Sequence, residues 1–257
     1  MRLKLTSLGL FLLASTSINA ATIISQWTFE TAPPADLSNS SSSPTVIADV
    51  GNGSASGVHG SGNTDWSTPP GNGSANSFSA NTWAVGDYWQ FQVRTLGFED
   101  IALSWDQASS GTGPKDFKLQ FSTTGTLFSD FGNYVVQENP SSSLNWNSTT
   151  YRSGFLIQMD LSLNNELEDL SSVYFRLVNT STAKANGTLG AASAGGASRI
   201  DNFTVNGTAI ERVPVSTPDA GSSLLLLSLA FGGITGVLRW RKQPDRDFTC
   251  RYSKPSV

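Results

Sequence analysis

The sequence has little of three things that many proteins use for chemistry: cysteine, histidine and charge. Among its 257 residues, Cys250 is the only cysteine and His59 the only histidine. One cysteine excludes an intrachain disulfide and Cys-x-x-Cys metal or redox chemistry, and one histidine excludes a zinc site built from several histidines. The fold must therefore be held by its core, which a chain of this length can bury without covalent links.

The few charges are unevenly placed. Charged residues make up 14% of the chain, residues 21–215 carry 8 Lys and Arg against 17 Asp and Glu, and residues 239–257 carry 6 against 2. The body is thus strongly acidic and lacks the basic stripe that binds nucleic-acid phosphates, so we expect no nucleic-acid partner. The abundance of Gly, Ser, Thr and Asn suits an exported, turn-rich β protein.

The N-terminus has the three parts of a secretory signal peptide. Arg2 and Lys4 precede the apolar run 8–14, and small residues follow up to Ala20. The run is too short to span a bilayer, so we assign residues 1–20 as a signal peptide with cleavage after Ala20.

A second apolar segment lies near the C-terminus. Residues 220–238 carry no charge, and Arg239, Trp240, Arg241 and Lys242 follow directly. About 20 apolar residues match the hydrocarbon core of a bilayer, and a basic cluster stays on the cytoplasmic side. The sequence predicts a transmembrane helix over 220–238, an exported body before it and a basic cytoplasmic tail over 243–257.

A short motif precedes this helix. It comprises Thr217, Pro218, Asp219, Ala220 and Gly221. Pro214 and Pro218 keep this approach extended, as a protease site requires. Motif, apolar helix and Arg-rich end together resemble a PEP-CTERM sorting signal, in particular its Val-Pro-Asp-Ser-Gly class, with Thr217 in place of valine and Ala220 in place of serine. The resemblance implies that residues 212–242 are recognised by an exosortase, a membrane protease of Gram-negative bacteria that make exopolysaccharide. A plain membrane anchor with a proline-containing stalk is the alternative.

Between the two ends, apolar residues alternate with polar ones. The runs with this pattern are 23–29, 88–95, 101–106, 116–122, 155–161, 173–177 and 201–205. Strict alternation is typical of strands with one buried face, and turn-forming clusters separate the runs. Residues 21–211 are therefore predicted to form an all-β sandwich, for which we favour a jelly-roll arrangement. Residues 36–82 are predicted to be a long polar loop, with one short strand near 45–49.

The body also resembles an ectodomain that recurs in PEP-CTERM proteins. The matching stretches are 81–91, 111–117, 174–177 and 198–203. This resemblance implies the fold and the exported location, and no activity.

No catalytic motif is present. His59 lies in the glycine-rich stretch 57–62 and is expected to be a solvated loop residue. An enzyme on this scaffold would need two carboxylates, as glycoside hydrolysis does. Glu99, Asp100, Asp106, Glu166, Glu168 and Asp169 are available, but their spacing selects no pair.

Two further carboxylates suggest a structural metal site. Glu30 ends the first predicted strand and Asp201 begins the last. Terminal strands of a jelly roll often lie side by side, and carboxylates with loop carbonyls suit calcium. The alternative is that Asp201 pairs with Arg199 or caps a turn. No other cofactor is indicated.

The six tryptophans of the body fall into two groups. Trp27, Trp89 and Trp105 lie in register with aliphatic residues and are expected in the core. Trp66, Trp83 and Trp146 lie in polar surroundings. Exposed indoles would suit contact with the face of a sugar ring, preferably of a neutral polysaccharide. Alternatively, they cover the ends of the sandwich.

The sequence therefore predicts an exported, non-catalytic protein. It would be anchored in the inner membrane, processed by an exosortase-like protease and then displayed at the cell surface or in the extracellular matrix with exopolysaccharide. The alternative is a secreted carbohydrate-active enzyme on the same sandwich.

Overall fold

A computed structural model describes residues 20–212. The predicted signal peptide, the sorting motif at 217–221, the transmembrane helix at 220–238 and the basic tail lie outside these residues. Within them, no helix is long and apolar enough to cross a membrane. The described chain is all-β, apart from two short 3-10 turns at Ser153–Phe155 and Asn165–Leu167.

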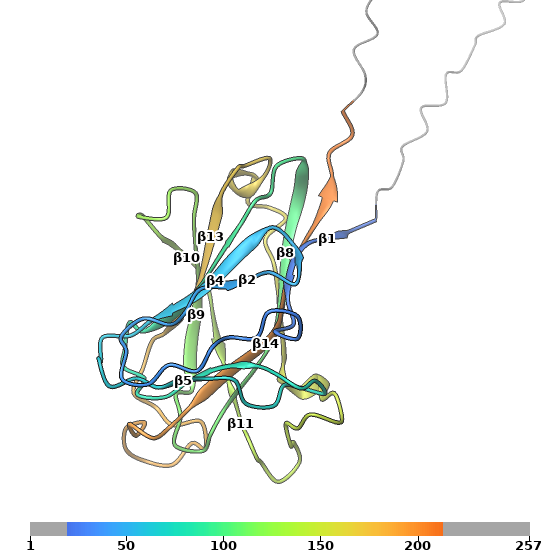
Figure 1. The fold of residues 1–257 in the computed structure, drawn as a ribbon. Helices are drawn as coiled ribbons and strands as arrows, with labels where there is room; N and C mark the ends of the chain where they lie inside the picture. Colours follow the sequence, from blue (N-terminus) through green and yellow to red (C-terminus); the bar gives the residue numbers. More distant parts are fainter. Residues whose placement is uncertain (1–19, 213–257) are drawn as a thin grey trace, which may run out of the picture. The chain divides into compact units, whose positions relative to one another are not determined.

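The strands form two sheets (Figure 1). The eight-stranded sheet contains β1 (Thr22–Trp27), β3 (Val50–Gly51), β5 (Trp66–Ser67), β6 (Phe78–Ala80), β8 (Phe98–Ser109), β11 (Gln137–Glu138), β12 (Leu156–Asp160) and β14 (Ser198–Ala209). The six-stranded sheet contains β2 (Val46–Ile47), β4 (Gly53–Val58), β7 (Tyr88–Val93), β9 (Asp116–Ser122), β10 (Ser129–Val135) and β13 (Val173–Asn179).

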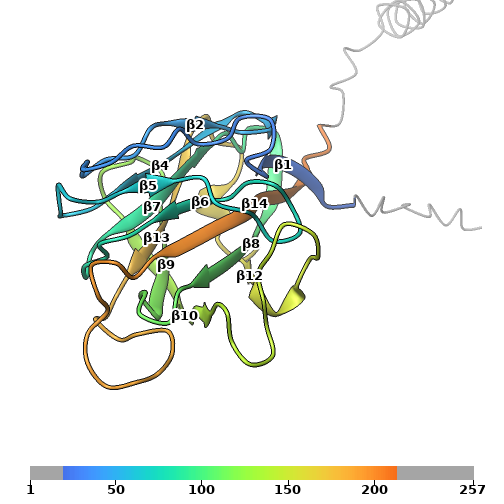
Figure 2. The same ribbon diagram turned by 60° about the horizontal axis from the view of Figure 1, so that its bottom comes forward.

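The order of strands is β11-β8-β14-β1-β3 in the larger sheet and β10-β9-β13-β7-β4-β2 in the smaller one. β14 pairs antiparallel with β1, β6 and β8, so the last strand lies in the interior of its sheet (Figure 2). The first and last strands are thus neighbours, as the sequence predicted.

The core lies between the two sheets and is mostly aromatic. Phe203 on β14 stacks on Phe91 of β7, with ring centroids 3.6 Å apart, and Trp27 on β1 meets the same Phe91 edge-on at 5.1 Å. The alternation predicted for Trp27, Trp89 and Trp105 is confirmed, since each is fully buried. A register shift between Ile23 and Ser25 turns Ile23 outward, so the expectation that Ile23 shares the buried face is wrong.

The expectation of a long loop over 36–82 is also wrong, although the short strand near 45–49 is present as β2. This segment holds five strands, from β2 to β6, which contribute to both sheets. In β4 the inward positions are Gly53, Ala55 and Gly57. A Cβ at Gly53 would stand 2.7 Å from the ring of Trp27, and one at Gly57 would stand 2.2 Å from the ring of Trp66. The small residues make room for indoles supplied by other strands, so the segment itself shows little apolar periodicity.

Candidate functional site

The three tryptophans predicted to contact sugar are buried. Trp66, Trp83 and Trp146 are 1%, 7% and 4% exposed. Their indole N–H groups donate to the carbonyl oxygens of Ser40, Ala80 and Pro70, at 2.9, 2.9 and 2.8 Å respectively. The expectation that these rings are exposed for sugar contact is therefore wrong. Trp66 and Trp83 belong to the main core, and Trp146 packs with Ala108 and Phe155 in a separate small cluster.

His59 is buried as well, contrary to the expectation of a solvated loop residue. Its ring lies 4.7 Å from Trp66 and 4.2 Å from Trp83, and its Nδ1 lies 3.1 Å from the Thr64 hydroxyl and 3.5 Å from Asp87. Burial lowers the pKa of His59 to about 4, against the opposing effect of the Asn81 and Thr82 carbonyl groups. The imidazole is therefore neutral near pH 7, and it fills a space in the core.

Asp201 and Glu30, the predicted calcium ligands, meet the same loop, residues 70–76. Asp201 Oδ2 accepts hydrogen bonds from the Asn72 backbone N–H at 2.9 Å and from the Ser74 hydroxyl at 2.7 Å. Glu30 Oε1 accepts from the Asn76 backbone N–H at 2.7 Å. The two carboxylates thus hold the two halves of one loop.

The turn that carries Glu30 is organised by Asp49. Its carboxylate accepts backbone N–H groups from Thr28, Phe29, Thr31 and Ala32. Burial raises the pKa of Asp49, but the hydrogen bonds outweigh this effect and the net result is a lowered pKa. Asp49 therefore stays ionised and fixes the chain after β1, from which Glu30 reaches Asn76.

The structure adds a third carboxylate, Asp106. It lies directly opposite Asp201 in the β8–β14 ladder, and both side chains are buried. Asp106 accepts from Asn202 Nδ2 at 2.9 Å and from the Tyr151 hydroxyl at 3.4 Å. Burial raises the pKa of Asp106, and burial together with the adjacent Asp106 raises the pKa of Asp201 to about 7.

This cluster offers only oxygen donors, which suits a hard cation. Among residues 20–212, no three His, Cys, Asp or Glu side chains are close enough to form a metal site by themselves. The Ser74 hydroxyl and the Asn76 carbonyl oxygen would have to complete it. Both atoms lie close to Asp201 Oδ2. A Cβ built on Gly71 would stand 1.9 Å from Ser74 Oγ, 2.2 Å from the Asn76 carbonyl oxygen and 2.5 Å from Asp201 Oδ2, so the three oxygens surround one point. The donor types therefore fit calcium.

A different set of functional groups covers the outward side of the six-stranded sheet. We call it the polar face and define it by the outward residues of its central rows. These are Ser54, Ser56, Tyr88, Gln90, Gln92, Lys118, Gln120, Asp130, Tyr174 and Arg176. Antiparallel sheets often keep one face in water, but this one is rich in amide, guanidinium and phenol groups. The sequence analysis assigned the polar residues of 88–95, 116–122 and 173–177 to the exposed side of strands, placed Ser54 and Ser56 in a loop, and assigned Asp130 to no strand.

Strand register aligns five of these residues in one row. The row comprises Ser56, Gln90, Arg176, Gln120 and Asp130, one from each of β4, β7, β13, β9 and β10. Arg176 Nε donates to Gln90 Oε1 at 2.8 Å, and Gln120 Nε2 donates to Asp130 Oδ1 at 2.7 Å. These bonds fix the orientation of side chains that would otherwise be mobile.

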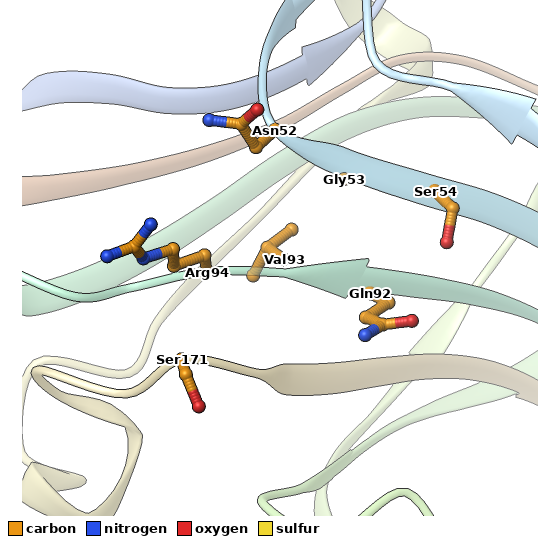
Figure 3. A pocket seen from close by; sticks show the side chains of 7 residues that line it. All are labelled: Asn52, Gly53, Ser54, Gln92, Val93, Arg94 and Ser171. Atoms are coloured by element: carbon orange, nitrogen blue, oxygen red, sulfur yellow. The ribbon is translucent and has the colours of Figure 1, made fainter.

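A cavity of about 400 Å³ lies at one end of this face (Figure 3). It is lined by Asn52, Gly53, Ser54, Gln92, Val93, Arg94 and Ser171. Figure 3 shows these residues on three neighbouring segments, at the ends of β4 and β7 and before β13. Its lining is rich in hydrogen-bonding groups, and its volume lies within the range of small-molecule sites.

No known family model and no curated protein matches the chain. Among solved structures, the K1 adhesin domain of Lys-gingipain from Porphyromonas gingivalis W83 is similar at 14% identity, with 72% of this chain and 97% of that domain covered and a TM-score of 0.39. The CBM22-1–GH10 modules of Clostridium thermocellum xylanase 10B, solved with xylohexaose, are similar at 11% identity. The match covers 76% of this chain and 30% of that one, with a TM-score of 0.39. Similarity at this level does not identify a shared function.

Proposed function

We propose that the chain is an exported, non-catalytic surface protein whose sandwich binds polysaccharide through the polar face. The observation that carries the proposal is the row across β4, β7, β13, β9 and β10. In this row, hydrogen bonds fix the orientation of amide and guanidinium groups before any ligand binds. Sugars present arrays of hydroxyl groups that both donate and accept. Fixed amides and a planar guanidinium complement such arrays, and a preordered face loses little side-chain entropy on binding.

The route to the surface is part of the same proposal. The order of signal peptide, body, motif at 217–221, apolar segment and basic cluster supports export and handling by an exosortase-like protease. A protein retained in an exopolysaccharide layer benefits from a face that contacts the polymer.

We also propose that the buried pair Asp201 and Asp106 holds a calcium ion, together with Ser74 Oγ and the Asn76 carbonyl oxygen. The observation in favour is that two buried carboxylates face each other, although neither takes part in an ion pair with another residue of the 20–212 region. The ion would offset their charge and tie the 70–76 loop to β8 and β14.

Residues 21–212 contain the whole described core and are the domain to be tested. The test is retardation of this domain in native gels that contain individual polysaccharides. We expect retardation by at least one of them and no release of reducing sugar. Gln92→Ala, on the polar face, should weaken retardation, whereas Gln158→Ala, exposed on β12 of the other sheet, should not.

Two results would contradict this proposal. Absence of retardation across the panel would remove the polysaccharide-binding role. Release of reducing sugar that is lost in Asp106→Asn or Asp201→Asn would instead identify the carbohydrate-active enzyme, with this buried pair as its carboxylates.

A further inference from the structure

We infer that the polar face is specific for acidic polysaccharides and that the Arg176 guanidinium receives their carboxylate groups. This inference rests on the proposed polysaccharide-binding function and names the chemical class of the ligand.

Arg176 is held between two aromatic rings. Its Cζ lies 4.0 Å from the centroid of the Tyr88 ring and 3.6 Å from that of Phe128. Two rings cannot occupy the same side of one carbon at these distances, so they enclose the guanidinium from different sides. The bond from Nε to Gln90 fixes the remaining rotation. The side chain is therefore oriented before any ligand arrives, which reduces the entropy lost on binding.

The edge of the guanidinium is free. Nη1 and Nη2 have no hydrogen-bond partner within residues 20–212, and no carboxylate of this region forms an ion pair with Arg176. Arg176 is partly buried. The guanidinium has therefore lost part of its hydration without gaining a partner anion. Its two parallel N–H groups match the two oxygens of a carboxylate.

The surrounding charge also permits an anion, although the body as a whole is acidic. On the strands of the six-stranded sheet, the carboxylates are Asp116 and Asp130. Asp130 already accepts from Lys118 at 2.9 Å and from Gln120, and Asp116 accepts from the Ser181 hydroxyl at 2.6 Å. The charge of Asp130 is thus balanced by Lys118, and Asp116 lies four residues along β9 from Gln120, the residue that pairs with Arg176.

The cavity provides room for a sugar unit further along the same face, beyond the row that contains Arg176. Gln92 lines the cavity and lies opposite Tyr174 in the sheet. The neighbouring row on the same face contains Gln90 and Arg176. Arg94 lines the same cavity and is exposed, so a second cation stands close to the ring position. Hydroxyl and amide groups of Ser54, Asn52 and Ser171 can bond the sugar hydroxyls while a guanidinium binds the carboxylate (Figure 3).

The experiment compares one polymer with and without its charge. Residues 21–212 are run in native gels that contain polygalacturonate or the same polymer after its carboxyl groups have been reduced to alcohols. We expect retardation by polygalacturonate alone, and weaker retardation as sodium chloride is added. Arg176→Gln should raise the dissociation constant at least about tenfold, because a charge-assisted bidentate contact is lost. Arg176→Lys should lose most of the affinity as well, because lysine lacks the planar fork.

Arg152→Gln is the matched control, since Arg152 is exposed in a loop away from this face and the substitution changes the net charge equally. It should bind like the unchanged protein. If Arg176→Gln does not fold, as judged by its thermal melt, Arg176→Lys takes its place. A folded Arg176→Lys protein that binds polygalacturonate with unchanged affinity overturns the inference.

The two proposals fail in different ways. Equal retardation by the charged and the reduced polymer, or by neutral polysaccharides alone, overturns the specificity for acidic sugars and leaves the proposed function intact. No retardation by any polysaccharide overturns both.

Discussion

Asp106 and Asp201 are direct cross-strand neighbours on β8 and β14, and both of their carboxyl groups are buried. Like charges placed opposite each other destabilise a sheet, and burial adds a desolvation cost. Backbone and side-chain donors from Asn72, Ser74 and Asn202 offset part of this cost. A bound cation would remove most of the remainder.

Calcium should therefore stabilise the domain. An ion that binds only the folded state adds about 2.7 kcal/mol at a hundredfold excess over Kd. We expect a chelator to lower the melting temperature of residues 21–212, and Asp201→Ala to abolish this response. Asp130→Ala, which removes an exposed carboxylate on β10, should keep it. A melting curve that chelator leaves unchanged would rule out the site.

Gly57 should not tolerate a side chain. Its Cβ would stand 2.2 Å from the Trp66 ring, which is fully enclosed. We expect Gly57→Ala to lower the free energy of unfolding by about 1–3 kcal/mol, as overpacked cores do. Gly62→Ala is the control, because nothing lies within 4 Å of a Cβ at that position. Urea denaturation measures both, and equal stability of the two variants would contradict the packing described for β4.

His59 should make stability depend on pH. Its pKa is about 4 in the folded protein and near 6.5 when unfolded. As the pH falls from about 7 to 4, the unfolded chain binds a proton that the folded protein does not, so the free energy of unfolding falls. The loss amounts to about 3 kcal/mol, at 1.36 kcal/mol per pKa unit. His59→Gln lacks this titration, so the stability of the unchanged protein minus that of the variant should decrease by this amount over the same range. Parallel pH profiles would show that His59 titrates alike in both states.

Processing should remove both ends of the chain. These segments lie outside the described residues, and the expectation comes from the motif at 217–221 and the apolar segment after it. The mass of the native protein should correspond to a start near Ala21 and an end between Thr217 and Gly221. A native protein that still contains Arg251 and Tyr252 would be held by a plain membrane anchor.

The strands that the sequence predicted correctly are those that carry their own large apolar residues. In β7, β9 and β13, Phe, Trp and Leu alternate with polar residues. The pattern of buried and exposed positions can therefore be recognised within each strand's own sequence. β4 escaped detection because its buried positions are Gly and Ala, filled by Trp27 and Trp66 from elsewhere. β10 was not predicted because it is an edge strand with mainly exposed residues. Its sequence therefore shows no alternation of apolar and polar residues.

The candidate sites were predicted to different degrees. Glu30 and Asp201 were selected because the sequence places them at the end of the first strand and the start of the last, and the expected fold makes these strands neighbours. In the structure Asp201 lies within β14. Asp106 could not be selected, because its partnership with Asp201 depends on the register of β8 against β14. The burial of Trp66 and Trp83 depends on the path of the 36–82 segment, which was read as a loop. Arg176 gains its environment from Tyr88 and from Phe128, a residue after β9, and no local pattern brings these together.

The position of β14 also determines how the domain would respond to a pulling force. The strand runs between β1 and β8, and Thr22 at the start of β1 lies opposite Gly207 near the end of β14. Tension between the two chain ends would peel β1 from β14 one residue pair at a time, which requires little force. Tension between the C-terminal end of β14 and a polymer on the opposite sheet would instead shear β14 against both neighbours at once. If the domain were attached at its C-terminus and bound to a polymer through its polar face, tension would thus act in the direction in which the sandwich is mechanically stronger.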